Sequence, residues 1–289
     1  MKDRIEYIAF ILLSYFLRVI GLKLARKFAF FLALLFYNLI PIRKKTVFEN
    51  LDIAFPEMSF SKKKKIAFQS YYNFCISVVE ILLLPYLSKE KVKTLVKTDK
   101  VEFLKRKYEE KKGLILISAH FSNWEYIAAS VSLQMEIPFN IIVKNQRNRF
   151  VNDWLNMART KWINKVIPLG LSIRNAFNIL KNGEILAVVA DQRGPEEGLK
   201  LKFFGKETSV FTGPAVLSLK TGAPIVFGIP IRLNDFNYIA EIYELDMSNL
   251  PDDFNSQVKE ICQRMVRFLE EIISKYPEQW LWMHKRWKH

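Results

Sequence analysis

Short apolar runs alternate with amphipathic stretches after about Gly113, and this alternation constrains the fold more than any other feature of the sequence. The apolar runs predict strands at 114–118, 139–143, 185–190, 225–231 and 238–243. The stretches between and after them predict helices at 124–134, 148–162, 172–181, 214–221 and 253–275. This order predicts an α/β fold, with a central, largely parallel or mixed sheet flanked by helices. In such sheets functional residues lie beyond the carboxyl ends of the strands.

The N-terminus carries two apolar runs, at 7–17 and 28–42, separated by Arg18, Lys23, Arg26 and Lys27. Neither run alone reaches the roughly 20 residues that a straight membrane span needs. Either the Arg18 side chain snorkels and a span extends from about residue 5 to residue 22, or both segments lie in the membrane interface or cover a core. We predict residues 1–45 as membrane-anchoring apolar helices. A mostly helical segment with a break near Pro56 follows them.

The charge of the chain requires anionic partners. There are 44 Lys and Arg residues against 29 Asp and Glu, a net charge of +15. Phospholipid headgroups, phosphorylated substrates, acidic carrier proteins and nucleic acids all fit this charge. Nucleic acid is set aside because the aromatic residues lie in apolar runs and no recognition motif is present. Cys75 and Cys262 have no nearby partner at metal-ligand spacing, so no metal site is predicted.

One histidine lies just beyond the carboxyl end of a predicted strand, where functional residues of such sheets are found. The run at 114–118 leads directly to His120, whose neutral imidazole can accept a proton from a hydroxyl near pH 7 if a carboxylate orients it. Glu125 is the nearest carboxylate. Residues five apart on a helix point about 140° away from each other, so the pair meets only if His120 precedes the helix. Ser122 as N-cap predicts this start, but Ser122-x-x-Glu125 is also explained by a capping box without catalysis.

Several motifs resemble one family. His-Phe-Ser-Asn-Trp-Glu at 120–125 resembles the His-x-x-x-x-(Asp/Glu) signature of the lysophospholipid acyltransferase superfamily. The flanking residues are most similar to the bacterial acyltransferases that add the late, secondary chains of lipid A. Segments 190–192, 203–205, 212–215 and 277–284 resemble that family in the same order, so the resemblance covers nearly the whole chain.

The resemblance implies a lysophospholipid-acyltransferase-like fold, with residues 46–289 as the catalytic domain including its helical lead-in. It also implies transfer of an acyl chain from acyl carrier protein to a hydroxyl on a glucosamine-linked hydroxyacyl chain of a lipid A precursor, at the cytoplasmic face of the inner membrane. The thioester, on carrier protein or coenzyme A, is then a substrate, and no cofactor is expected. His120 would deprotonate the acceptor hydroxyl and Glu125 would orient His120, without a Ser or Cys nucleophile.

The resemblance also indicates binding residues for an anionic acceptor. Arg159 falls where the family carries an arginine, and Asp191 and Arg193 follow the predicted strand at 185–190. Lys144 and Arg147 follow the strand at 139–143 and carry charge suited to phosphate. A solvated charged surface explains any one of these basic residues equally, and Asp191 equally organises its own loop.

Two other functions remain open from the sequence. In the first, the chain is an acyltransferase whose acceptor is a lysophospholipid or a phosphatidylinositol mannoside. The tetrad Asp191-Gln-Arg-Gly, in place of the Glu-Gly-Thr-Arg of glycerolipid enzymes, argues against a glycerolipid acceptor. In the second, the chain is a basic peripheral membrane-binding protein without enzymatic activity.

Overall fold

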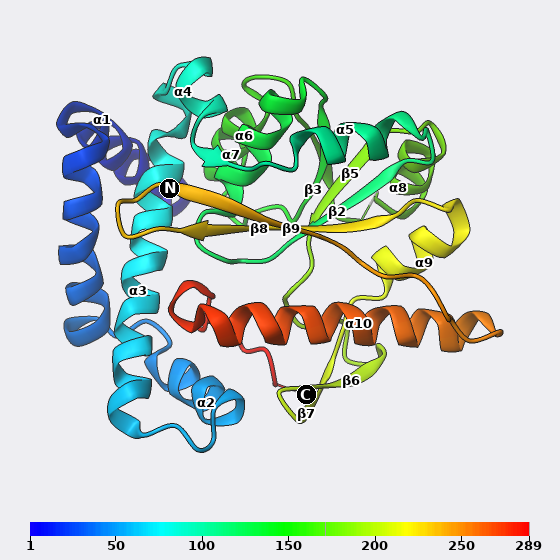
Figure 1. Cartoon of the computed structure of the whole chain (residues 1–289). Helices are drawn as coiled ribbons and strands as arrows, with labels where there is room; N and C mark the ends of the chain where they lie inside the picture. Colours follow the sequence, from blue (N-terminus) through cyan, green and yellow to red (C-terminus); the bar gives the residue numbers. More distant parts are fainter. Residues whose placement is uncertain (171, 289) are drawn as a thin grey trace.

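A central seven-stranded sheet organises the molecule, seen in a computed structural model that describes residues 1–170 and 172–288 (Figure 1). The strand order is β1-β9-β8-β2-β5-β3-β4. Its strands are β1 (Val96–Lys97), β2 (Leu114–Ser118), β3 (Phe139–Val143), β4 (Lys165–Pro168), β5 (Ile185–Val189), β8 (Ile225–Arg232) and β9 (Tyr238–Glu244). Only the β8–β9 pair among these is antiparallel. The predicted α/β class with a mixed, largely parallel sheet is confirmed.

The five predicted strands are present as β2, β3, β5, β8 and β9, whereas four others were missed. Strands β1 and β4 are only two and four residues long and carry lysine, so their apolar pattern is too short to recognise. The other two, β6 (Lys200–Phe203) and β7 (Lys206–Ser209), form a separate antiparallel hairpin that is mostly polar.

Helices cover both faces of the sheet, as the alternation of side chains along β8 demands. Phe227, Ile229 and Ile231 join one hydrophobic cluster with α8 (Ser172–Lys181), α9 (Gly213–Thr221) and α10 (Phe254–Lys275). Val226 joins a second cluster with α4 (Lys89–Lys93), α5 (Val101–Glu109) and α6 (Trp124–Met135). In Figure 1, α10 and α5 accordingly lie on opposite sides of the strands. Helix α7 (Arg149–Thr160) follows β3.

The N-terminal helices form one edge of the molecule. Helix α1 (Lys2–Leu34) continues into a π-helical turn, η1 (Leu35–Leu39), and lies beside α3 (Phe60–Leu83) (Figure 1). Gly21 kinks α1 with a φ of 75°, a left-handed value that glycine adopts without strain. Helix α2 (Lys44–Ala54) ends just before Pro56, at the predicted break. The segments Lys2–Leu39 and Phe60–Tyr86 are long and apolar enough to cross a membrane, by length and composition only.

Candidate active site

Strand register brings His120 and Asp191 together. β2 and β5 run parallel and adjacent, with Ser118 opposite Val189, and each strand is followed by one alanine. The Ala190 N–H donates to the Ser118 carbonyl at 3.1 Å and carries the pairing one residue further. His120 and Asp191 therefore leave the sheet at the same edge and the same level.

Asp191 holds the His120 imidazole by hydrogen bonds. Its Oδ1 lies 2.8 Å from His120 Nδ1, and its Oδ2 accepts from the His120 backbone N–H at 3.0 Å and from Trp280 Nε1 at 2.8 Å. Burial lowers the pKa of His120, but the Asp191 charge and hydrogen bond outweigh it and raise that pKa above its ordinary value. Burial raises the pKa of Asp191, yet His120 and Trp280 hold it below its usual range. Asp191 thus occupies Nδ1 of the ring, and the other ring nitrogen, Nε2, is contacted by the Gln192 side-chain amide at 3.3 Å.

The residues after His120 form a loop whose conformation is held by hydrogen bonds. Ser122 has a φ of 42°, an unusual value for a residue other than glycine that costs about 1–3 kcal/mol. Its N–H donates to the Gln279 carbonyl at 2.8 Å, its Oγ donates to Gln279 Oε1 at 2.5 Å, and its own carbonyl accepts from Ser77 Oγ at 2.6 Å. Helix α3 and the C-terminal segment thus impose the conformation that places His120.

The N-cap predicted at Ser122 is wrong, and so is the alternative explanation of Glu125 as part of a capping box. Helix α6 begins at Trp124, and its N-cap is Asn123, whose Oδ1 accepts from the Tyr126 N–H at 3.1 Å. The Ser122 N–H, which a capping-box glutamate would accept, is already bound to Gln279. The turn that Ser122 makes is left-handed, so the cap moves one residue along the chain.

Glu125 pairs with Arg159. Arg159 Nε lies 3.0 Å from both carboxylate oxygens of Glu125, and Nη2 lies 2.6 Å from Oε1. The two side chains are only 9% and 15% exposed. Burial lowers the pKa of Arg159, but the Glu125 carboxylate outweighs it and raises that pKa. The carboxylate hydrogen-bonded to the His120 ring is therefore Asp191, which the sequence had placed in acceptor binding. The charge of Glu125 helps to raise the pKa of His120 through space.

Comparison with known proteins assigns the family. The profile of the bacterial lipid A biosynthesis acyltransferases matches residues 3–289. The chain belongs to this family. The lipid A biosynthesis palmitoleoyltransferase of Escherichia coli K12 is 23% identical over 248 residues, which cover 85% of this chain and 79% of that protein. The lauroyltransferase of the same organism is 24% identical over 251 residues, with the same coverage. A phosphatidylinositol mannoside acyltransferase of Mycolicibacterium smegmatis is 24% identical over 181 residues, 61% of this chain and 57% of that protein.

The chain is therefore an acyltransferase, and the reading as a membrane-binding protein without enzymatic activity is set aside. Its two cysteines are poor nucleophiles. Cys75 and Cys262 are buried, and burial raises the pKa of each thiol to about 12, so neither forms a thiolate near neutral pH.

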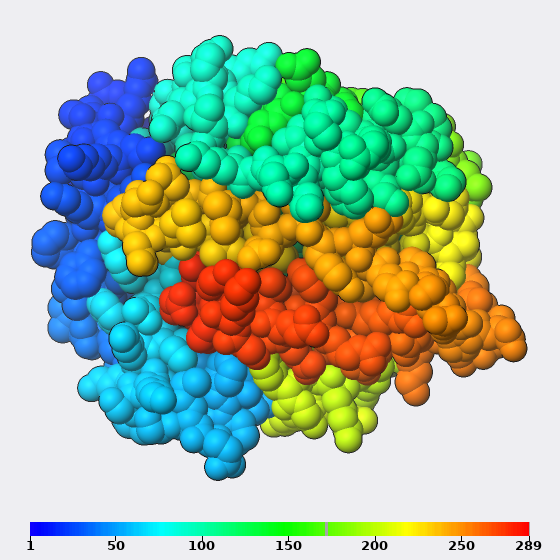
Figure 2. Space-filling model, viewed as in Figure 1, coloured from blue at the N-terminus to red at the C-terminus, as the bar shows by residue number. Residues whose placement is uncertain are grey.

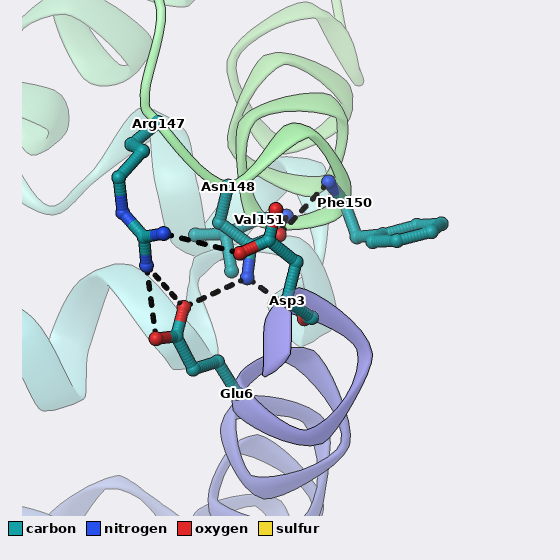
Figure 3. A network of polar contacts seen from close by, with 6 residues as sticks. All are labelled: Asp3, Glu6, Arg147, Asn148, Phe150 and Val151. Atoms are coloured by element: carbon teal, nitrogen blue, oxygen red, sulfur yellow. Dashed lines mark hydrogen bonds and ion pairs between the residues drawn. The ribbon is translucent and has the colours of Figure 1, made fainter. Parts of the chain in front are cut away.

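Two of the predicted basic binding residues lie apart from His120. Lys144 is exposed in the loop between β3 and α7. Arg147, in the same loop, reaches α1, where its guanidinium lies 3.2 Å from Asp3 Oδ1 and 2.7 Å from Glu6 Oε2 (Figure 3). Asn148 caps α7 and also donates to the Asp3 carbonyl at 2.8 Å. This network joins the start of α1 to the start of α7, the helix that carries Arg159 in its last turn. Phosphate binding by Lys144 or Arg147 stays a prediction.

Arg193 follows Asp191 by two residues and is partly buried. Its Nη1 is buried and has no hydrogen-bond partner within residues 1–170 and 172–288. A role in acceptor binding stays a prediction for Arg193 and for Arg159, whose guanidinium is occupied by Glu125.

Glu80 on α3 ties the active-site loop to the N-terminal helix. Its side chain is fully buried, and it accepts from Arg26 of α1 at 2.7 Å, from Asn123 Nδ2 at 2.9 Å and from Tyr238 Oη at 2.5 Å. Sequence reasoning missed this residue because only tertiary contact distinguishes it from an ordinary helical glutamate.

Replacing Glu80 with alanine is expected to lower the free energy of unfolding by about 3–5 kcal/mol. The buried Arg26 guanidinium, the Asn123 amide and the Tyr238 hydroxyl would all lose their acceptor. Equilibrium urea denaturation measures the free energy of unfolding of the parent and the variant. The control is Glu136→Ala, which removes an exposed ion pair with Lys93 and should change stability little. Equal, small effects in both variants would contradict the role assigned to Glu80.

Proposed function

We propose that the chain transfers a fatty acyl group from acyl carrier protein to a hydroxyl of a lipid A precursor, with His120 as general base. The supporting observation is the Asp191–His120 hydrogen bond, because it occupies Nδ1 and leaves Nε2 as the basic nitrogen. Asp191 then orients the imidazole and stabilises the imidazolium that forms.

The proposed reaction is direct transfer in a ternary complex. His120 Nε2 takes the proton of the acceptor hydroxyl while the hydroxyl oxygen attacks the thioester carbonyl carbon. The C–O bond forms, the C–S bond breaks, and the imidazolium returns the proton to the departing thiolate. The Glu125–Arg159 pair lies beside this centre, where Glu125 adds to the field that favours the imidazolium.

We further propose that the enzyme works at the inner, cytoplasmic membrane surface. Helix α1 forms an outer edge of the molecule (Figure 2), and apolar side chains on it are open to solvent. Ile8, Leu12, Val19 and Phe31 are 56%, 64%, 70% and 65% exposed. Exposed apolar surface of this kind beside a net charge of +15 suits an anionic leaflet, and the same charge suits an acidic carrier protein.

A transfer assay with three acceptors tests the proposal. Acyl carrier protein that bears a labelled acyl group is offered to the purified protein. The acceptor is a tetra-acylated, phosphorylated lipid A precursor, a lysophospholipid or a phosphatidylinositol mannoside. We expect label on the lipid A precursor alone. Label on the lysophospholipid alone would refute the acceptor class while keeping the chemistry.

The phosphatidylinositol mannoside is included because one relative is a phosphatidylinositol mannoside acyltransferase. That match covers less of both chains than the matches to the lipid A enzymes, so we rank this acceptor second. Coenzyme A thioesters, offered in parallel, compare the two donors.

A further inference from the structure

A small cavity opens beside His120. It has a volume of about 10 Å³, and His120 and Asn73 are among the residues that line it. This space is about the minimum for one water-sized polar group. Because His120 lines it, the cavity is where a reacting hydroxyl would meet the base.

Asn73, which lines this cavity, carries a hydrogen-bond acceptor that has no partner in the described part of the chain. The residue lies on α3, is 9% exposed, and donates from Nδ2 to the Glu278 carbonyl at 2.7 Å. That bond decides the orientation of the amide, since only the nitrogen can face a carbonyl oxygen. The remaining atom, Oδ1, is buried and has no partner within the described part of the chain.

A buried carbonyl oxygen without a donor is costly, by an amount comparable to a lost hydrogen bond. His120 does not relieve it, because its Nδ1 is bound to Asp191 and its Nε2 must remain a base. The acceptor hydroxyl does not relieve it either, because its single hydrogen goes to Nε2 in the proposed reaction. The hydrogen for Asn73 Oδ1 therefore comes from another group, either an ordered water or a second donor on the substrate.

We propose that Asn73 Oδ1 binds a second N–H or O–H group on the acyl acceptor, next to its reacting hydroxyl. This rests on the proposed function and narrows its substrate class. A hydroxyacyl chain linked to the sugar by an amide carries such an N–H, whereas an ester-linked chain carries only oxygen acceptors there. A sugar hydroxyl is the other possible donor. A site that binds an N–H discriminates strongly against an analogue that lacks it.

The test compares two acceptors that differ only in an amide or ester link to the hydroxyacyl chain. Asn73→Leu and Asn73→Asp both lose the bond to the Glu278 carbonyl, but only Asn73→Asp keeps acceptor oxygens. We expect Asn73→Leu to raise the acceptor KM by about tenfold to a hundredfold, with the donor KM unchanged. Asn73→Asp should retain more affinity than Asn73→Leu. Thermal unfolding confirms that both variants are folded.

The outcomes separate the possible sources of the hydrogen. If the parent prefers the amide acceptor and Asn73→Leu abolishes that preference, the amide N–H is the donor. If Asn73→Leu weakens both acceptors equally, a sugar hydroxyl is the donor. An unchanged acceptor KM, or a rise in the donor KM alone, would overturn the proposal. A parent that acylates neither acceptor would instead show that the proposed function is wrong.

Discussion

Replacing His120 with alanine is expected to lower kcat for acyl transfer by at least about a hundredfold. The variant keeps the sheet and the cavity but has no group at Nε2 to take the hydroxyl proton. Because transfer then needs hydroxide or water as base, the loss should lie in kcat, with little change in the KM of either substrate. Steady-state transfer of a labelled acyl group from acyl carrier protein measures kcat and the two KM values.

Lys112→Ala is a matched control for His120→Ala. Lys112 lies just before β2, at the opposite end of the strand from His120, and its side chain is 61% exposed. This variant should transfer at the parental rate. A folded His120→Ala protein with parental kcat would exclude His120 as the base.

Replacing Asp191 with asparagine is expected to lower kcat by up to about ten-thousandfold, the loss seen when the carboxylate of a catalytic triad is neutralised. The amide has nearly the same shape, but its NH₂ group can donate to His120 Nδ1. That contact places the ring proton on Nε2 and removes the base. The Glu125→Gln variant is the comparison, because it also neutralises a carboxylate. Glu125 is hydrogen-bonded to Arg159, whereas Asp191 is hydrogen-bonded to the His120 ring.

The pH profile tells a chemical role of Asp191 from a purely structural one. His120 works as a base only when neutral, so kcat/KM rises as pH increases through the His120 pKa. Burial lowers this pKa, but Asp191 outweighs burial and raises it above 6.5, so the acidic limb of the parent should lie above pH 6.5. In Asp191→Asn burial is no longer opposed by that charge, and the limb should move to lower pH. A limb that stays in place would argue against an Asp191–His120 pair in the reaction.

Local sequence pattern was sufficient for the class of fold. The strands at 114–118 and 139–143 have their predicted bounds, because a central parallel strand must be apolar along its whole length. The same pattern placed His120 at the carboxyl edge of β2, since that edge depends only on strand direction. It failed for β1, a two-residue strand that pairs with the distant β9, and for the hairpin β6–β7, whose strands are short and mostly polar.

The partner of His120 could have been anticipated in part. Two neighbouring parallel strands that each end two residues before a titratable side chain predict a contact, and 114–118 and 185–189 form such a pair. The sequence does not say that these strands are neighbours, because the strand order β8-β2-β5-β3 departs from the chain order. Glu125 was therefore chosen on its proximity in the sequence and on the family motif that it shares with His120.

The sequence by itself determined the α/β class, the family and the position of His120, because these depend on periodicity and on motifs that are local in the chain. Only the tertiary structure decided which carboxylate binds His120, where α6 begins and what surrounds the cavity. Those features come from α3, β5 and the C-terminal segment, and hydrogen bonds between elements so far apart in the chain leave no periodic signal in the residues that make them.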